Sequence, residues 1–305
     1  MRTIRLLPNG PATSCLGYGT ASLMGRIGTR ASLRLLERAY DEGIRYFDTA
    51  PSYGLGEAEA VVGRFASGRR DSIVLATKFG LKPILANKWT NVAKRMARPL
   101  LTLTPALRRR ARSTLSAGLN PVAHFNVEDA RRSLENSLHL LKTDYIDILL
   151  MHECRIVDLR NESLLNMLHE AQAAGKIRAF GIGTDIATVQ AAVRDAPEFT
   201  RVLQFASNAA SPNLNCFDTT DGRAYITHSP FGGVGRTLFG KLSGTAVSDR
   251  SRIAKALLRS AVRNNPGGVV LFSAQSPEHI ASNVGAIAAS DEEDEALLTP
   301  LREHL

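Results

Sequence analysis

The sequence predicts an α/β protein whose parallel sheet closes into a (β/α)8 barrel, the TIM barrel. Segments with strand and helix patterns alternate along the chain, and strands that run parallel need helical crossovers between them. A length of 305 residues is ordinary for such a barrel with insertions. Apart from the acidic run over 291–295, no linker, internal repeat or low-complexity tract interrupts the chain. We therefore expect one domain over residues 1–305.

The N-terminal part of the chain shows the alternation clearly. Apolar residues at helical spacing predict a helix over 32–41, and Gly43 is a typical residue to end it. A short apolar strand is expected over 44–47, and a helix over 56–65 keeps its apolar residues on one face. The run over 73–77 is apolar and β-branched, which favours a third strand, counting one before the first helix.

The pattern resumes at Asn126, which is a typical N-cap residue with Asp129 three positions later. Apolar residues recur at helical spacing from there to Leu141, so we expect a helix. The elements expected after it are, in order, a strand over 145–151, a helix over 164–174, a strand over 179–182, a helix over 187–193 and a strand over 202–205.

Regular patterns weaken in the last third of the chain. Residues 208–222 are expected to form a loop, and 231–244, which contain five glycines, a long connection. The remaining expected elements are a strand over 224–227, a helix over 250–263, a strand over 268–272 and a helix over 277–288. Counted as strand-then-helix units, the whole series gives eight.

Polar residues stand at the ends of three of these strands. Asp48, Lys78 and His152 each follow a strand directly, and Tyr53 lies in the loop after Asp48. The C-terminal ends of all strands meet at one face of a barrel, so we expect these four side chains to converge. An ammonium group beside a phenol makes the phenol a stronger acid, and Asp48 would hold that ammonium in place. The pattern therefore indicates Tyr53 as a proton donor.

These residues and their surroundings resemble the aldo-keto reductase family, whose Asp, Tyr, Lys and His tetrad occurs in the same order. The agreement covers Asp48-Thr49-Ala50, Tyr53-Gly54, Glu57, the strand-end Lys78 and the run from Asp147 to His152. It also covers Gly17-Tyr18-Gly19-Thr20 as the first strand, Gly175-Lys176-Ile177-Arg178 with Gly181, and Ser229-Pro230. The resemblance extends over roughly the whole chain apart from one insertion.

The resemblance implies an NADP(H)-dependent reductase of carbonyl compounds, or a dehydrogenase of sugars or alcohols that runs in the opposite direction. Hydride would pass between the nicotinamide and the carbonyl carbon while Tyr53 exchanges a proton with the oxygen. Lys78, paired with Asp48, would lower the pKa of the phenol, and His152 would orient the carbonyl. No metal site is expected.

The resemblance also implies a set of cofactor-binding residues. Gln204 stands where the family has a glutamine that bonds the nicotinamide carboxamide, Thr184 stands near the place of a Ser-Asn pair, and His228 replaces a tyrosine that stacks on the nicotinamide. The full expected set is Gly19, Thr20, Asp48, Thr184, Gln204, His228, Ser229, Phe231, Ser273, Gln275, His279 and Asn283.

The choice between the two dinucleotides stays open at this point. Ser273, Gln275 and His279 replace the basic residues that usually bind the adenosine 2′-phosphate, so the expected Arg or Lys charge is missing there. Family habit favours NADP(H), whereas the missing charge would allow NAD(H). We expect only a modest preference for NADPH.

A basic insertion follows the third strand, over residues 82–125. Between Ser72 and Val127 the chain has ten Lys or Arg residues and no Asp or Glu, a charge of +10 against +9 for the whole chain. A loop there would begin at the rim of the active site and would attract anionic carbonyl substrates. The alternative is a solvated surface excursion. Nucleic-acid binding through Arg108-Arg109-Arg110 and Trp89 is not favoured, because no nucleic-acid-binding fold accompanies them.

Function class and location follow from the same features. A barrel that keeps nucleotide binding but acts as a regulatory or partner-binding module is the alternative to an enzyme, and the intact tetrad favours the enzyme.

No apolar stretch is long enough for a membrane span, and Met1 to Ser14 lacks a signal-peptide core. Cys15, Cys154 and Cys216 are far apart and odd in number, which favours free thiols and a cytoplasmic protein. The sequence does not indicate an oligomeric state.

Overall fold

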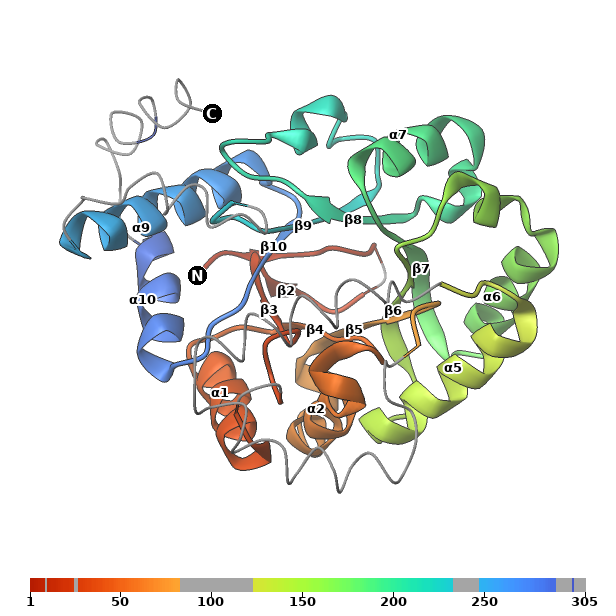
Figure 1. Ribbon diagram of the computed structural model, residues 1–305, viewed down its shortest axis with the longest axis horizontal. Helices are drawn as coiled ribbons and strands as arrows, with labels where there is room; N and C mark the ends of the chain where they lie inside the picture. The colour runs from red at the N-terminus through yellow and green to blue at the C-terminus, as the bar shows by residue number, and fades with distance from the viewer. Residues whose placement is uncertain (9, 25–26, 83–122, 233–246, 289–297, 299–305) are drawn as a thin grey trace, which may run out of the picture.

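A computed structural model describes residues 1–8, 10–24, 27–82, 123–232, 247–288 and 298. Eight parallel strands form a closed barrel in which β10 pairs with β3 and each of the other strands pairs with the next along the chain (Figure 1). The strands are β3 (Leu16–Gly19), β4 (Tyr46–Asp48), β5 (Val74–Phe79), β6 (Ile146–His152), β7 (Ile177–Gly183), β8 (Val202–Ala206), β9 (Ala224–His228) and β10 (Val269–Phe272). The predicted (β/α)8 barrel is confirmed.

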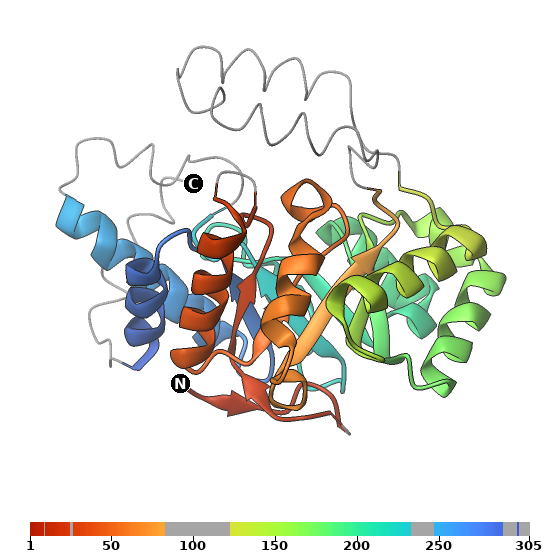
Figure 2. The ribbon, with the colours of Figure 1, turned by 90° about the horizontal axis from the view of Figure 1, so that it is seen from below.

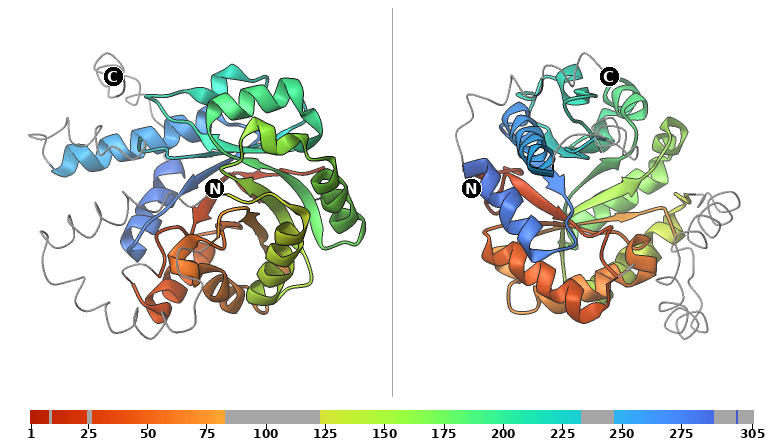
Figure 3. Two further views of the ribbon diagram at one scale, coloured as in Figure 1. Left: turned by 45° about the vertical axis from the view of Figure 1, so that its right-hand side comes forward. Right: turned by 60° about the vertical axis from the view of Figure 1, so that its left-hand side comes forward.

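Helices cover the outside of this barrel (Figures 1 and 3). Neighbouring helices pack on one another around the ring, with α1 between α10 and α2, α2 against α5, α5 against α6, and α9 against α10. Their bounds are α1 (Thr29–Asp41), α2 (Ala58–Ala66), α5 (Val127–Leu141), α6 (Glu162–Ala173), α7 (Ile186–Asp195), α9 (Val247–Asn264) and α10 (Pro277–Ala288). Short 3-10 turns are η1 (Tyr53–Gly56), η2 (Arg70–Ser72), η3 (Ile156–Arg160), η4 (Pro197–Phe199) and η5 (Asn213–Cys216).

The helix boundaries have local causes that the sequence indicates. The side chain of Asn126 accepts a hydrogen bond of 2.8 Å from the backbone N–H of Asp129, so Asn126 caps α5 as expected. Asn161 and Asp185 cap α6 and α7 in the same way. After α1, Gly43 adopts a φ of 90°, the left-handed conformation that glycine tolerates best.

Strand alternation divides the apolar residues into two cores. Along β6, Ile148 and Leu150 point into the barrel, whereas Leu149 and Met151 belong to the larger core between the sheet and the helices. The interior of the barrel is filled by side chains from all around the sheet, including Tyr46 and Leu271. The interior of the barrel is thus a packed core, which leaves the ends of the barrel as the places where a ligand could bind or another segment could pack.

An N-terminal hairpin closes one end of the barrel. It consists of β1 (Thr3–Ile4) and β2 (Thr13–Ser14), which pair antiparallel. Leu6 and Leu7, from the turn between them, are buried against the interior core of the barrel. Figure 2 shows the hairpin across the end from which the barrel strands start. The chain pattern did not predict this hairpin, because its strands are only two residues long.

A buried carboxylate joins β5 to β6 near their starts. Asp147 accepts hydrogen bonds from the backbone of Leu75 at 2.9 Å and from Arg70 at 2.7 Å, and its other oxygen lies 3.0 Å from Arg178. The Asp147 side chain is 1% exposed, so both arginines compensate a charge that has almost no access to water. Asp147 belongs to the run from Asp147 to His152 that resembles the family, and its contacts with Leu75, Arg70 and Arg178 link β6 to the neighbouring segments.

One expectation is wrong, and two lie largely outside the described residues. The segment between β8 and β9 contains the short η5 turn and no α-helix, so the count of eight strand-then-helix units is wrong by one helix. The expected loop over 208–222 is confirmed. The predicted insertion over 82–125 lies outside the described residues except at its ends, as does most of the connection over 231–244. Cys15, Cys154 and Cys216 carry free thiols, as expected.

Candidate active site

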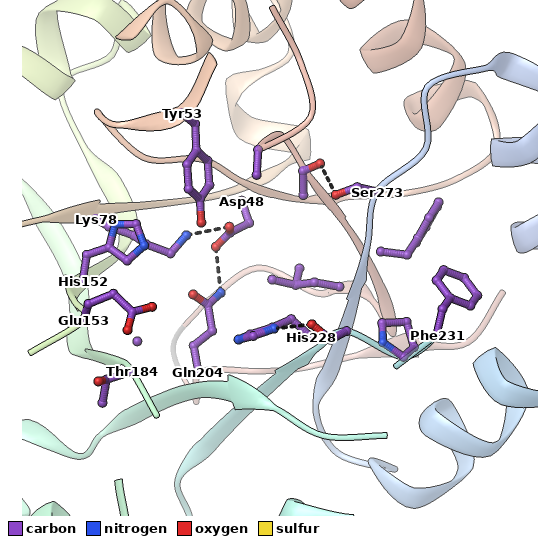
Figure 4. A pocket seen from close by; sticks show the side chains of 17 residues that line it. Asp48, Tyr53, Lys78, His152, Glu153, Thr184, Gln204, His228, Phe231 and Ser273 are labelled. Atoms are coloured by element: carbon purple, nitrogen blue, oxygen red, sulfur yellow. Dashed lines mark hydrogen bonds and ion pairs between the residues drawn. The ribbon is translucent and has the colours of Figure 1, made fainter. Parts of the chain in front are cut away.

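The C-terminal ends of the eight strands surround a hollow of about 380 Å³ (Figure 4). Every strand of the barrel contributes to its wall. The lining residues that come from strands are Gly19 from β3, Asp48 from β4, Lys78 from β5, His152 from β6, Gly183 from β7, Gln204 from β8, His228 from β9, and Leu271 and Phe272 from β10. Tyr53 enters from η1. The four predicted catalytic residues therefore lie in one site at the expected end of the barrel.

Asp48 is the central acceptor of this site. Its Oδ1 atom lies 2.6 Å from Nζ of Lys78, and its Oδ2 atom accepts a 2.8 Å hydrogen bond from Nε2 of Gln204. Lys78 also donates to the backbone oxygen of Thr49 at 3.0 Å. Asp48 and Lys78 are almost completely buried, and burial of an ion pair is tolerated only when hydrogen bonds satisfy its remaining atoms. Asp48 thus fixes the position of the ammonium group.

Tyr53 is presented to this pair by a tight turn. Gly54 and Leu55 both have left-handed backbones, with φ values of 58° and 60°, and they reverse the chain directly after the tyrosine. Nζ of Lys78 lies 4.8 Å from the centroid of the Tyr53 ring. The ring also meets His152 edge-on, with the two centroids 5.7 Å apart. Figure 4 shows the Tyr53 hydroxyl directed toward Lys78 and Asp48.

The acidity of Tyr53 differs in part from the expectation. Burial raises the pKa of the phenol, Lys78 lowers it by charge and hydrogen bonding, and Asp48 raises it. The net pKa lies above the ordinary value, so the expected lowering by Lys78 is present but is outweighed by burial. The pKa of Lys78 is itself raised, because Asp48 and Tyr53 more than offset the effect of burial. At neutral pH the site therefore holds an ammonium beside a protonated phenol.

Both histidines of the hollow are neutral at neutral pH. Burial and, to a smaller extent, the charge of Lys78 together lower the pKa of His152 to about 3. Burial also lowers the pKa of His228, whose Nδ1 atom lies 3.0 Å from the hydroxyl of Ser229. A neutral imidazole can donate one hydrogen bond to a carbonyl oxygen without supplying a charge. This is the state that an orienting role for His152 requires.

The predicted cofactor residues divide between two neighbouring hollows. Gly19, Thr184, Gln204, His228 and Ser229 line the first one. A second hollow of about 780 Å³ is lined by Gln275, His279 and Asn283, and both hollows share Phe231 and Ser273. Thr20 lies in neither lining.

Two basic residues of the second hollow were missed by the sequence analysis. Arg250 and Lys255 from α9 line it beside His279. They restore cationic charge at the place where Ser273, Gln275 and His279 had left none. Their signal in the sequence is weak, because the helical pattern of α9 does not show which of its faces meets α10. The spatial arrangement of the two helices reveals it.

Two glycines of the lining stand where a side chain would crowd its neighbours. A Cβ atom at Gly183 would lie 3.1 Å from Oε1 of Gln204, and one at Gly19 would lie 3.0 Å from the hydroxyl of Ser273. A side chain at either position would press on a lining residue.

In the part of the chain that the structure describes, no group of three or more His, Cys, Asp or Glu is arranged to hold a metal ion. Within the same residues, no helix combines the length and apolar character needed to cross a bilayer.

Fold and site together define a (β/α)8-barrel protein with an Asp, Tyr, Lys and His cluster at the C-terminal end of its strands. The sequence model described as the aldo/keto reductase family matches residues 15–217. The chain belongs to this family.

Known relatives agree with this assignment. The chain is 33% identical over 206 residues to a D-threo-aldose 1-dehydrogenase of a Pseudomonas species, covering 61% of this chain and 55% of that protein. It is 31% identical over 189 residues to an aldo-keto reductase of Bacillus subtilis, covering 60% of this chain and 46% of the relative. The chain thus spans about half the length of the curated relatives it matches.

A solved structure extends the similarity to nearly the whole chain. It is an aldo/keto reductase from Klebsiella pneumoniae in complex with NADP and acetate, which aligns with a TM-score of 0.69 at 23% identity and covers 99% of this chain and 96% of that chain. Likeness at this level of identity concerns the fold.

Proposed function

We propose that the protein is an NADP(H)-dependent oxidoreductase that interconverts a small carbonyl compound and the corresponding alcohol. The observation that supports this best is the convergence of Asp48, Tyr53, Lys78 and His152 on one hollow at the end of the barrel. An acid, a cation that tunes it and a neutral hydrogen-bond donor are the groups that proton delivery to a carbonyl oxygen needs. The family assignment, which rests on the sequence match over residues 15–217, supports the same proposal.

In this mechanism Tyr53 is the proton donor in reduction and the acceptor in oxidation. Negative charge that develops on the carbonyl oxygen is met by the phenolic proton, while the Lys78 ammonium favours the phenolate that is left. Nε2 of His152 donates a hydrogen bond to the same oxygen and fixes the direction of the carbonyl. Asp48 keeps Lys78 charged and in place. A bound nicotinamide supplies or takes up the hydride.

The two hollows fit a dinucleotide in size and lining. Their volumes of about 380 and 780 Å³ lie in the range of small-molecule sites, and Phe231 and Ser273 border both. The nicotinamide end would occupy the first hollow, against His228 and Thr184. The adenosine end would occupy the second. There Arg250 and Lys255 would bind the 2′-phosphate, which favours NADPH over NADH.

The test of this function is absorbance at the reduced-nicotinamide band with aldehydes, ketones and sugars, measured in both directions. We expect turnover with NADPH that the Tyr53→Phe variant loses. A protein that binds neither dinucleotide at millimolar concentration would contradict the proposal. Binding without turnover on any carbonyl or alcohol in the panel would also contradict it.

A further inference from the structure

The catalytic hollow contains a carboxylate that the mechanism above does not use. Glu153 follows His152 directly after β6 and lines the hollow. In Figure 4 its carboxylate points toward Gln204, in the space between His152 and Thr184. Among the described residues, its side chain forms no ion pair and accepts no hydrogen bond. Glu153 is an exposed residue at the wall of the hollow. A carboxylate that has no protein partner there and faces a ligand site is a candidate for contact with the ligand.

The backbone holds Glu153 in a strained conformation. Its φ is 55°, in the left-handed region that residues other than glycine rarely adopt. The conformation is fixed by pairing with β7, because His152 stands opposite Gly183 and the N–H of Glu153 donates to the Gly183 oxygen at 2.9 Å. Glycine would be unstrained here. An observed outlier of this kind at the wall of a site points to a function for the side chain.

The charges around the hollow leave Glu153 unbalanced. Lys78 is the cation of the lining, and it is held at 2.6 Å by Asp48. His152 is neutral, as argued from its pKa of about 3. Burial raises the pKa of Glu153, Asp185 raises it further, and Lys78 lowers it. The carboxylate therefore offers strong hydrogen-bond acceptors and, when ionised, a negative potential that no described lining residue cancels.

We propose that Glu153 determines substrate class: its carboxylate accepts hydrogen bonds from hydroxyl groups close to the reacting carbonyl and disfavours substrates that carry a carboxylate or phosphate. The Cα atoms of Glu153 and His152 are about 3.8 Å apart, so a hydroxyl two or three carbons from the carbonyl is within reach. The preferred substrates are neutral, polyhydroxylated, sugar-like carbonyl compounds. This inference rests on the proposed function, and it opposes the anionic substrates that the basic segment suggested.

The test compares three aldehydes of equal chain length: threose, butanal and succinic semialdehyde. In the wild type we expect kcat/KM to be at least about tenfold higher for threose than for butanal, and lowest for succinic semialdehyde. Glu153→Gln keeps an acceptor but removes the charge, so it should raise kcat/KM for succinic semialdehyde relative to butanal by about tenfold. Glu153→Gly removes the acceptor without adding backbone strain, so it should abolish the preference for threose. Glu37→Gln, on the outer surface of α1, is the matched control.

The outcomes separate this inference from the proposed function. If no aldehyde is turned over with either dinucleotide, the proposed function fails and the inference fails with it. If the wild type is active but both Glu153 variants keep its order of preference, only the inference is overturned. A loss of NADPH affinity of tenfold or more in Glu153→Gln would also overturn it, because Glu153 would then contact the cofactor. Circular dichroism spectra and melting temperatures close to those of the wild type show that the variants are folded.

Discussion

Lys78 lies under the ring of Tyr53, with its Nζ atom 4.8 Å from the ring centroid. The Lys78 side chain is 2% exposed and its Nζ lies 2.6 Å from Asp48, so the ammonium acts on the phenol through a medium with little water. Burial alone would make Tyr53 a weaker acid. The cation limits that effect and stabilises the phenolate when the proton leaves. Loss of either residue should therefore impair proton transfer.

Replacement of Tyr53 by Phe removes the proposed proton donor while leaving the ring. We expect kcat for carbonyl reduction to fall by a factor on the order of 10² to 10⁴, the usual contribution of a general acid. The dissociation constant of NADPH should change less than about threefold, because the hydroxyl is not assigned to the cofactor. Single-turnover kinetics and fluorescence titration measure the two quantities. A variant with kcat near that of the wild type would exclude Tyr53 as the donor.

Replacement of Lys78 by Met should move the pH profile of reduction as well as lower the rate. The phenol must be protonated to act as an acid, so the rate falls as pH rises through its pKa. Lys78 lowers that pKa; without it the pKa rises, and the alkaline limb should shift to higher pH. Rates from about pH 8 to about pH 12, a range that brackets a phenol pKa above the ordinary value of about 10, test this, with circular dichroism to check folding. If the alkaline limb of the variant's pH profile stays at the same pH or moves to lower pH, Lys78 does not lower the pKa of Tyr53.

The cations of the second hollow should determine the preference for NADPH. The double variant Arg250→Gln, Lys255→Gln should lose about 10-fold to 100-fold in NADPH affinity, the effect expected for hydrogen bonds to a charged group. NADH affinity should change little. The control is Arg263→Gln, on the same helix but about 20 Å beyond Arg250 and about 12 Å beyond Lys255, both distances longer than the Debye length of about 8 Å at physiological salt. If the double variant and the control behave alike, the 2′-phosphate binds elsewhere.

Buried neutral histidine should make stability depend on pH. His152 takes up a proton in the folded protein only near pH 3, whereas in the unfolded chain it does so near pH 6.5. Between these values the unfolded state binds more protons, so stability falls as pH decreases, by up to about 1.4 kcal/mol per pH unit. Urea unfolding at pH 7, 6 and 5 should show a smaller slope for His152→Gln than for the wild type. The exposed His139→Gln is the control and should keep the wild-type slope.

Loss of Asp147 should affect stability and leave the chemistry intact. Asp147→Ala leaves Arg70 and Arg178 without their carboxylate, and removal of one partner from a buried ion pair costs about 3–5 kcal/mol. Because both arginines keep some contact with water, we expect the lower end of that range. Denaturant unfolding gives the value, with the exposed Asp71→Ala as control. A decrease in kcat of the folded variant would contradict a purely structural role.

The sequence was sufficient to predict that Asp48, Tyr53, Lys78 and His152 converge, because position along a parallel strand determines position in a barrel. Asp48, Lys78 and His152 each follow an apolar run, and parallel closure brings all such ends to one face. Arg250 and Lys255 could not be predicted in this way, since their role depends on which face of α9 meets α10. The net direction of the Tyr53 pKa shift could not be predicted from the sequence either. It is a balance of burial against charge, and burial depends on the assembled barrel.

Glu153 and the N-terminal hairpin were missed for different reasons. Glu153 stands next to His152 in the chain, but its orientation follows from a φ of 55°, which sequence patterns for glutamate do not indicate. The strands of the hairpin are too short to show an alternating pattern. What was predicted rests on repeating patterns over many residues, and what was missed rests on single backbone angles or on contacts between distant segments.

Because of the hairpin, the two ends of the barrel differ in role: one end covers the core and the other forms the hollow. Leu6 and Leu7 cover the interior core at the end where the strands start. The loops at the other end are therefore not needed to shield that end of the core from water. Substitutions that reshape the mouth can accumulate there without opening the core to solvent. Such a division allows the lining of the mouth to change while the closed end keeps the interior core covered.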